Sequence, residues 1–234
     1  ESLSRHFYLI LFVGLLYGLM AGAIMYLVSD WMTVMAAAAL TFAMLHLLNR
    51  FLHMDGLSDL GDGMVCGGNA ERKLAAMKDS KTGAGGVGYA LVFSIMSFAM
   101  LGSLWGPALF LLPLVAEIAN KNAVVFCASG GKAREGLGNM FVSNTGRKQA
   151  AISFVLCLGL SILLLLLFEG LFFRDLSFMT IVVALVAALV SSIVGLGMSV
   201  LAERNFGAVN GDVLGATNEI CRPIVLLLML LVII

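Results

Sequence analysis

Apolar runs divide the chain into seven segments that are long enough to cross a lipid bilayer. They cover residues 7–28, 31–52, 84–104, 105–128, 150–168, 179–202 and 213–234. The first run has about 22 residues, or about 33 Å of helix, which is enough to span the hydrocarbon core. The pattern predicts an all-α, polytopic membrane protein with about seven transmembrane helices, forming a single membrane-embedded domain over residues 1–234.

Three glycines interrupt the first run at four-residue spacing: Gly14, Gly18 and Gly22. Residues at this spacing line one face of a helix. Because glycine adds no side chain, such a stripe lets another helix approach closely. We therefore expect this face to pack against a neighbouring helix.

Three long polar segments separate the apolar runs, at 53–83, 129–149 and 203–212. With seven spans, all three fall on the side of the membrane that holds the N-terminus. Of the 14 Lys and Arg residues, only Arg174 falls on the opposite side. Because Lys and Arg favour the cytoplasmic side, we predict a multi-pass protein of the plasma (inner) membrane. Its polar groups would converge on a cavity that faces the cytoplasm.

Composition agrees with this class and argues against others. Hydrophobic residues make up 61% of the chain and charged residues 12%, about half the roughly 25% of a soluble domain. The net charge of zero gives no electrostatic reason to expect nucleic acid as a partner. Wide spacing without a CxxC pair predicts reduced, apolar cysteines rather than a disulfide framework or zinc site. The cysteines are Cys66, Cys127, Cys157 and Cys221.

The stretch HMDGLSDLGDGM, which begins at His53, concentrates carboxylates in a chain that otherwise avoids charge. Asp55, Asp59 and Asp62 stand at i, i+4 and i+7, so on a helix they share one face. Neighbouring carboxylates repel one another unless a cation or shared protons compensate. Oxygen ligands without cysteine favour Mg²⁺ or Mn²⁺. The intervening glycines are interpreted as room for a large substrate. The alternative for the aspartates is that they belong to a merely solvated loop.

Two later stretches carry further polar groups. MKDSKTGAGGVG combines Lys78, Asp79 and Lys81 with glycines where the third apolar run begins. Backbone N–H groups at a helix start, together with lysines, form a phosphate cradle. NGDVLGATNEI places Asp212 and Glu219 at i and i+7, on a second acidic helix face with small residues beside it.

Four other polar residues each have two interpretations. Glu117 and Lys121, at i and i+4 in an apolar run, either form an ion pair within the bundle or contact substrate. His53 either bonds a headgroup or the backbone, or acts in catalysis. Arg134 is either a surface loop residue or an anion-binding group.

Together these motifs resemble the cobalamin synthase family, whose three blocks read like HLDGLADTADG, IMKDSxxGxxG and GDxxGAxxE. The matches fall in the same order here, each beside an apolar run. AREGLGNMF is similar to the family's Ala-Arg-x-x-Gly-Leu-Gly segment, so the resemblance covers nearly the whole chain. Departures include Met54 and Ser58 in the first block and Asn210 before the last.

The resemblance implies an adenosylcobinamide-GDP ribazoletransferase, which acts late in cobalamin (vitamin B12) biosynthesis, in nucleotide loop assembly. Such an enzyme joins adenosylcobinamide-GDP to α-ribazole or its 5′-phosphate. GMP leaves, and adenosylcobalamin or its 5′-phosphate forms. The resemblance also implies a Mg²⁺-dependent transferase surrounded by membrane lipid. Whether the protein forms a homo-oligomer is left open.

This chemistry suggests roles for the polar residues, because phosphoryl transfer depends on positioning and charge neutralisation. The expected metal ligands are Asp55, Asp59, Asp62, Asp212 and Glu219. The expected phosphate or guanine-nucleotide ligands are Lys78, Lys81 and Arg134, and Asp79 beside them would complete the metal shell or the hydroxyl site. The candidate groups for taking the proton of the attacking hydroxyl are Asp59, Asp62 and His53.

Two rival functions share some of these features. The Asp-Gly-x-x-Asp-x-x-Asp-Gly pattern resembles that of CDP-alcohol phosphotransferases, but that class lacks the MKDSKTG and GDVLGATNE blocks. A corrinoid or ion transporter also needs broken helices and a polar cavity. A transporter would place its ionisable groups near mid-membrane in paired halves, whereas here the acids cluster on one side and no repeat is evident.

Overall fold

The structure, a computed structural model, describes residues 2–134, 136, 138–172 and 178–234. Over these ranges the chain is helical, with no strand and one isolated parallel bridge between Ala133 and Val209. The helices in chain order are α1 (Ser2–Arg5), the 3-10 helix η1 (Phe7–Leu9), α2 (Ile10–Ser29), α3 (Val34–Leu48), α4 (Leu52–Val65), α5 (Ala70–Met77), α6 (Ala84–Gly102), α7 (Ala108–Gly130), α8 (Asn139–Asn144), α9 (Arg147–Phe172), α10 (Phe178–Phe206) and α11 (Gly211–Ile233).

The prediction of an all-α chain with about seven spans is confirmed. Among the described residues, six helical stretches are long and apolar enough to cross a membrane. They correspond to η1 with α2, and to α6, α7, α9, α10 and α11. Helices α3 and α4 together form a seventh candidate, bent by 89° at the break between them. Helices are expected because the bilayer core contains no water to hydrogen-bond with backbone groups, and a helix satisfies these groups within itself.

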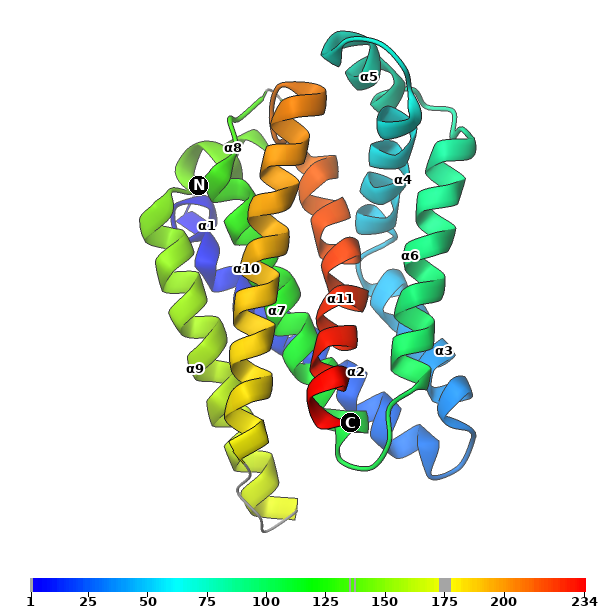
Figure 1. The fold of residues 1–234 in the computed structure, drawn as a ribbon, viewed down its shortest axis with the longest axis vertical. Coiled ribbons are helices and arrows are strands. Elements are labelled where there is room, and N and C mark those ends of the chain that lie inside the picture. The colour runs from blue at the N-terminus through cyan, green and yellow to red at the C-terminus, as the bar shows by residue number, and fades with distance from the viewer. Residues whose placement is uncertain (1, 135, 137, 173–177) are drawn as a thin grey trace.

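The polar segments lie at one end of the helical bundle. Figure 1 shows α5, α8 and the turn between α10 and α11 at the same end as the N-terminus, with the C-terminus at the other. This is the arrangement predicted from the order of the apolar runs. Arg174, the basic residue assigned to the opposite side, lies outside the described residues.

Helix α4 occupies a place that the apolar pattern did not predict. The segment 53–83 was expected to be a polar connection, but most of it forms α4 and α5. Helix α4 packs between α6 and α11 (Figure 1), so its acids are held by the bundle.

The break between α3 and α4 is made by two non-glycine residues with left-handed backbone conformations. Arg50 has φ 54° and Phe51 has φ 59°. This conformation costs roughly 1–2 kcal/mol for each such residue. The Phe51 N–H donates to the carbonyl oxygen of His46 over 2.9 Å and closes the turn. The bend redirects the chain so that α4 rises beside α11.

The glycine stripe of α2 packs against α7, as predicted. A Cβ on Gly14, Gly18 or Gly22 would lie 2.5 Å from a backbone carbonyl oxygen of α7. No side chain fits at that distance, so these glycines permit a close helix–helix contact.

The glycines of α4 serve the same purpose, and their interpretation as room for a substrate is wrong. A Cβ on Gly56 would lie 2.6 Å from the Asp212 carbonyl oxygen in α11. A Cβ on Gly61 would lie 2.7 Å from the Gly85 carbonyl oxygen in α6. These positions admit neighbouring helices, which bring the acids of α4 and α11 together.

Candidate active site

A polar cavity opens at the end of the bundle where the polar segments meet. It has a volume of about 450 Å³. Asp55 and Asp59 of α4 line one side and Asp212 of α11 another, while Lys78 and Asp79 contribute from the segment after α5. The structure thus brings together five residues that come from three separate stretches of the sequence.

Local structure explains why these acids face the cavity. Asp55 and Asp59 are one turn apart on α4 and therefore share a face. Asp212 lies in the first turn of α11, where the helix dipole favours a negative charge. Asn210 caps that helix, because its side-chain oxygen accepts from the Val213 N–H at 3.0 Å and its amide donates to Asp212 Oδ2 at 3.1 Å.

The cavity carries an excess of negative charge. Asp59 lies close enough to Asp55 and Asp212 for their charges to repel its own, and Lys78 offsets part of the charge at Asp212. One lysine cannot balance the carboxylates around it. Such a cavity is suited to a cation or to a ligand that carries one.

The donor set determines which cation would fit. Within the described part of the chain, no three His, Cys, Asp or Glu side chains are close enough to form a metal cluster by themselves. Mg²⁺ does not require one, because it commonly keeps several waters and takes one or two protein carboxylates together with substrate phosphates. The carboxylates of Asp55, Asp59 and Asp212 around one cavity fit that requirement, whereas a zinc site would call for Cys or His donors.

Asp62 has a different position from the other two aspartates of α4. Its carboxylate accepts the N–H groups of Gly83 and Gly86 at the start of α6, each at 2.7 Å, and it is not among the side chains that line the cavity. The prediction that the N–H groups at this helix start bind a phosphate is therefore wrong, because they bind Asp62 instead. This position favours a role in holding α6 against α4.

Lys81 and Arg134 lie at the same end of the molecule but not on the cavity wall. Both side chains are exposed. The backbone N–H of Lys81 donates to Asp79 Oδ1 at 3.0 Å, which orders the loop beside the cavity. Arg134 follows the Ala133–Val209 bridge, which joins its segment to the turn before α11. Their predicted phosphate contacts stay predictions.

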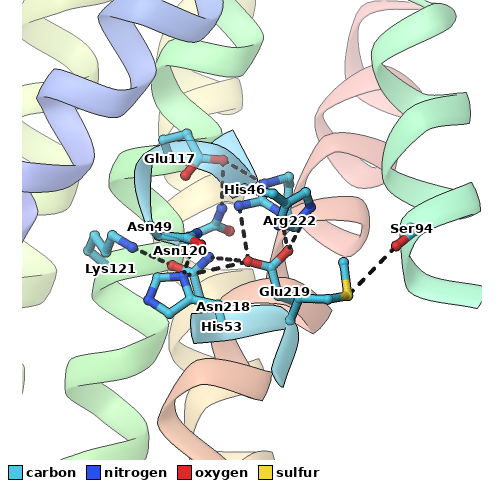
Figure 2. Close-up of polar contacts among 11 residues, drawn as sticks. His46, Asn49, His53, Ser94, Glu117, Asn120, Lys121, Asn218, Glu219 and Arg222 are labelled. Atoms are coloured by element: carbon cyan, nitrogen blue, oxygen red, sulfur yellow. Dashed lines mark hydrogen bonds and ion pairs between the residues drawn. The ribbon is translucent and has the colours of Figure 1, made fainter. Parts of the chain in front are cut away.

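A second polar cluster is buried deeper in the bundle (Figure 2). Arg222 of α11 donates through Nε to Glu117 of α7 over 2.6 Å, and through its terminal nitrogens to Glu219. All three side chains are at most 3% exposed. The pairing leaves neither carboxylate without a positive partner, which is the condition for burying charge at low cost.

The ion pair proposed between Glu117 and Lys121 is not formed. Glu117 pairs with Arg222, while Lys121 Nζ donates to Asn218 Oδ1 at 2.6 Å. Asn120 adds a further hydrogen bond to Glu117 at 3.1 Å. The two groups thus link α7 to α11 rather than to each other.

His53 and Glu219 belong to this buried cluster and not to the aspartate cavity. Nδ1 of His53 lies 3.6 Å from Glu219 Oε1 and 3.3 Å from the Asn49 amide nitrogen. Neither His53 nor Glu219 lines the cavity. The residues predicted to form one site are therefore divided between an open acidic cavity and a closed ionic cluster.

Comparison with known proteins shows the family of the chain. The family model described as cobalamin-5-phosphate synthase matches residues 1–230. The chain belongs to the cobalamin-5-phosphate synthase family. An adenosylcobinamide-GDP ribazoletransferase of Methanococcoides burtonii is 33% identical over 98% of this chain and 83% of its own length. One of Methanocella arvoryzae is 34% identical over 95% of this chain and 84% of its own. No solved structure matches the chain.

For this cobalamin-5-phosphate synthase family member, sequence reasoning missed several site residues. Ser80 and Thr82 line the acidic cavity, and their hydroxyls had been given no role. Arg222 is the centre of the buried cluster and Asn218 extends it. A signal was present for Arg222, because an ionisable residue within an apolar run is seldom there without a partner.

Proposed function

We propose that this chain is an adenosylcobinamide-GDP ribazoletransferase of cobalamin biosynthesis. It joins adenosylcobinamide-GDP to α-ribazole or its 5′-phosphate and releases GMP. Membership of the cobalamin-5-phosphate synthase family and the names of the relatives support this reaction. The observation that carries it is the cavity formed by Asp55, Asp59 and Asp212 beside Lys78, because these are the groups that a pyrophosphate reaction requires.

Magnesium is part of the proposal. One or two of the carboxylates of Asp55, Asp59 and Asp212 would hold the ion together with substrate phosphates, since these side chains line one cavity and Mg²⁺ prefers oxygen donors. Bound there, it would supply positive charge opposite the pyrophosphate oxygens and the departing phosphate. Asp62 and Glu219, also predicted as ligands, have positions that favour structural roles instead.

The side chains of the cavity can perform the remaining tasks. The attacking ribose hydroxyl forms a new bond to the phosphorus nearer the corrinoid, and the bond from that phosphorus to the bridging oxygen breaks. The bridging oxygen and its electron pair leave with GMP. Asp59 would accept the hydroxyl proton, and Lys78 would bind a phosphate oxygen; both side chains line the cavity.

We further propose that the cavity faces the cytoplasm and that lipid covers the apolar flanks. The excess of Lys and Arg at the cavity end supports the orientation. Large exposed side chains along the spans support contact with lipid, for example Leu16, Ile95, Val155 and Ile193, each at least 59% exposed. Such a surface would be unfavourable in water.

The test is reconstitution of the full chain in lipid nanodiscs with both precursors and Mg²⁺. Mass spectrometry should detect the joined corrinoid and GMP in equal amounts. Lys78→Gln should raise KM for the corrinoid donor about 10-fold to 100-fold, since a charge-assisted hydrogen bond contributes about 1.5–3 kcal/mol. Lys148→Gln is the matched control, because that side chain is exposed at the start of α9 and does not line the cavity. Corrinoid uptake into vesicles without any joined product would instead indicate a transporter.

A further inference from the structure

A second cavity lies in the groove between α4 and α6, next to the acidic cavity. Its volume is about 420 Å³. Asp55 and Thr82 line both cavities, so the groove opens where the acids lie. A molecule held in this groove would present one end to the place where we propose that the reaction occurs.

The walls of the groove are largely apolar. Phe51 and Met54 line it at the start of α4, and Val87, Ala90 and Leu91 line it from α6, while Ser58, Thr82 and Ser94 add hydroxyl groups. The Ser94 hydroxyl donates to the Met54 sulfur over 3.9 Å, so α4 and α6 are in contact at this point of the groove. Among the residues that the structure describes, Asp55 at the shared boundary is the only charged one that lines the groove. Its occupant is therefore expected to be uncharged and mainly apolar.

We propose that this groove binds the aromatic base of the acceptor riboside, an inference that rests on the proposed function. The acceptor consists of a neutral, bicyclic, methyl-substituted aromatic base joined to a ribose. Placed with its base in the groove, it would direct its ribose toward Asp55 and the acidic cavity. The charged pyrophosphate of the donor would then occupy the acidic cavity, so each substrate meets the surface that suits its charge.

The volume of the groove also indicates which of the two substrates it can hold. Small-molecule sites usually have volumes of about 300–1,000 Å³. A groove of about 420 Å³ is near the small end of that range, which suits a nucleoside. A corrin macrocycle with its amide side chains is several times larger than a nucleoside and must lie elsewhere.

The test fills the groove from the α6 wall and compares the two substrates. Ala90→Phe adds a ring to a half-buried position that lines the groove, and Ala99→Phe adds the same ring to a half-buried position on α6 outside it. Because a misfit of one methylene in an apolar pocket alters kcat/KM about 10-fold to 200-fold, Ala90→Phe should raise KM for α-ribazole at least about tenfold. KM for the donor should change less than about twofold in both variants.

A smaller acceptor gives a second readout. An imidazole riboside lacks the fused ring, so Ala90→Phe should shift the ratio of kcat/KM toward it by about tenfold or more. Ser94→Leu adds less volume to the same wall and repeats the test if Ala90→Phe does not insert into membranes. The assignment is contradicted if neither variant shifts the ratio of kcat/KM toward the imidazole riboside.

Other outcomes would also overturn the proposal. A higher KM for the donor alone would place part of the corrinoid in the groove. No change in either KM would mean that lipid, and not substrate, occupies it. If the wild-type chain joins no substrates, the proposed function fails by itself. In that case, direct binding of the fluorescent riboside tests separately whether the groove holds it. Ala90→Phe must weaken this binding and Ala99→Phe must not.

Discussion

Asp59 and Asp62 are three residues apart on α4, but we expect their replacement by asparagine to have different effects. Asp62 accepts two backbone N–H groups of α6 at 2.7 Å each. Asparagine keeps one oxygen, so one of the two charge-assisted bonds is lost, at a cost of about 1.5–3 kcal/mol. At about 2–4 °C per kcal/mol for a chain of this length, the unfolding midpoint should fall by roughly 3–12 °C.

Asp59→Asn should show the opposite pattern. Asp59 makes no hydrogen bond among the described residues, and neighbouring acids repel its charge. Removing that charge should leave the unfolding midpoint unchanged or slightly higher. If Asp59 accepts the proton of the attacking hydroxyl, turnover should fall about 100-fold to 10,000-fold.

The comparison requires two measurements on the same preparations. Thermal unfolding in detergent gives the midpoints, and release of GMP gives turnover at a temperature where all three proteins are folded. Under those conditions Asp62→Asn should keep most of its turnover. The reasoning is refuted if Asp62→Asn keeps the wild-type midpoint while losing as much turnover as Asp59→Asn, because Asp62 would then act in the chemistry.

Two further substitutions test the packing and the buried charges. Gly18→Ala places a methyl group 2.5 Å from the Leu114 carbonyl oxygen, so we expect a lower unfolding midpoint. Gly197→Ala, in open space on α10, should raise stability by up to about 1 kcal/mol through helix propensity. Arg222→Met removes the arginine that pairs with two buried carboxylates, which should cost about 3–5 kcal/mol and reduce the folded fraction on gel filtration. Arg204→Met, at an exposed position, is its control and should behave like the wild type.

The membrane makes most of this fold predictable from sequence. Six of the seven apolar runs correspond to spanning helices whose ends lie within a few residues of the predicted ones. The exception is the run over 31–52, which ends at the turn formed by Arg50 and Phe51. Neither residue favours a left-handed backbone, so the sequence carried no local signal for an 89° bend. Packing of α4 between its neighbours determines that turn.

The candidate site was predictable only in part, for a related reason. Helical spacing correctly placed Asp55 and Asp59 on one face, because that property is local to α4. It could not show that the start of α6 lies against Asp62, since that contact spans 21 residues of sequence. Likewise, helical spacing predicted Glu219 as a metal ligand, but its carboxylate binds Arg222, which also pairs with Glu117.

The buried cluster also bears on the geometry of the acidic cavity. Seven residues are close to two full turns of helix, so Glu219 and Asp212 point in nearly the same direction from α11. Arg222 and His53 hold Glu219 in place, and this fixes the rotation of α11 about its axis. The close contact between Gly56 and Asp212 fixes the distance to α4. The ionic cluster, two turns away along α11, thus orients Asp212 toward the cavity, although none of the cluster's own side chains lines that cavity.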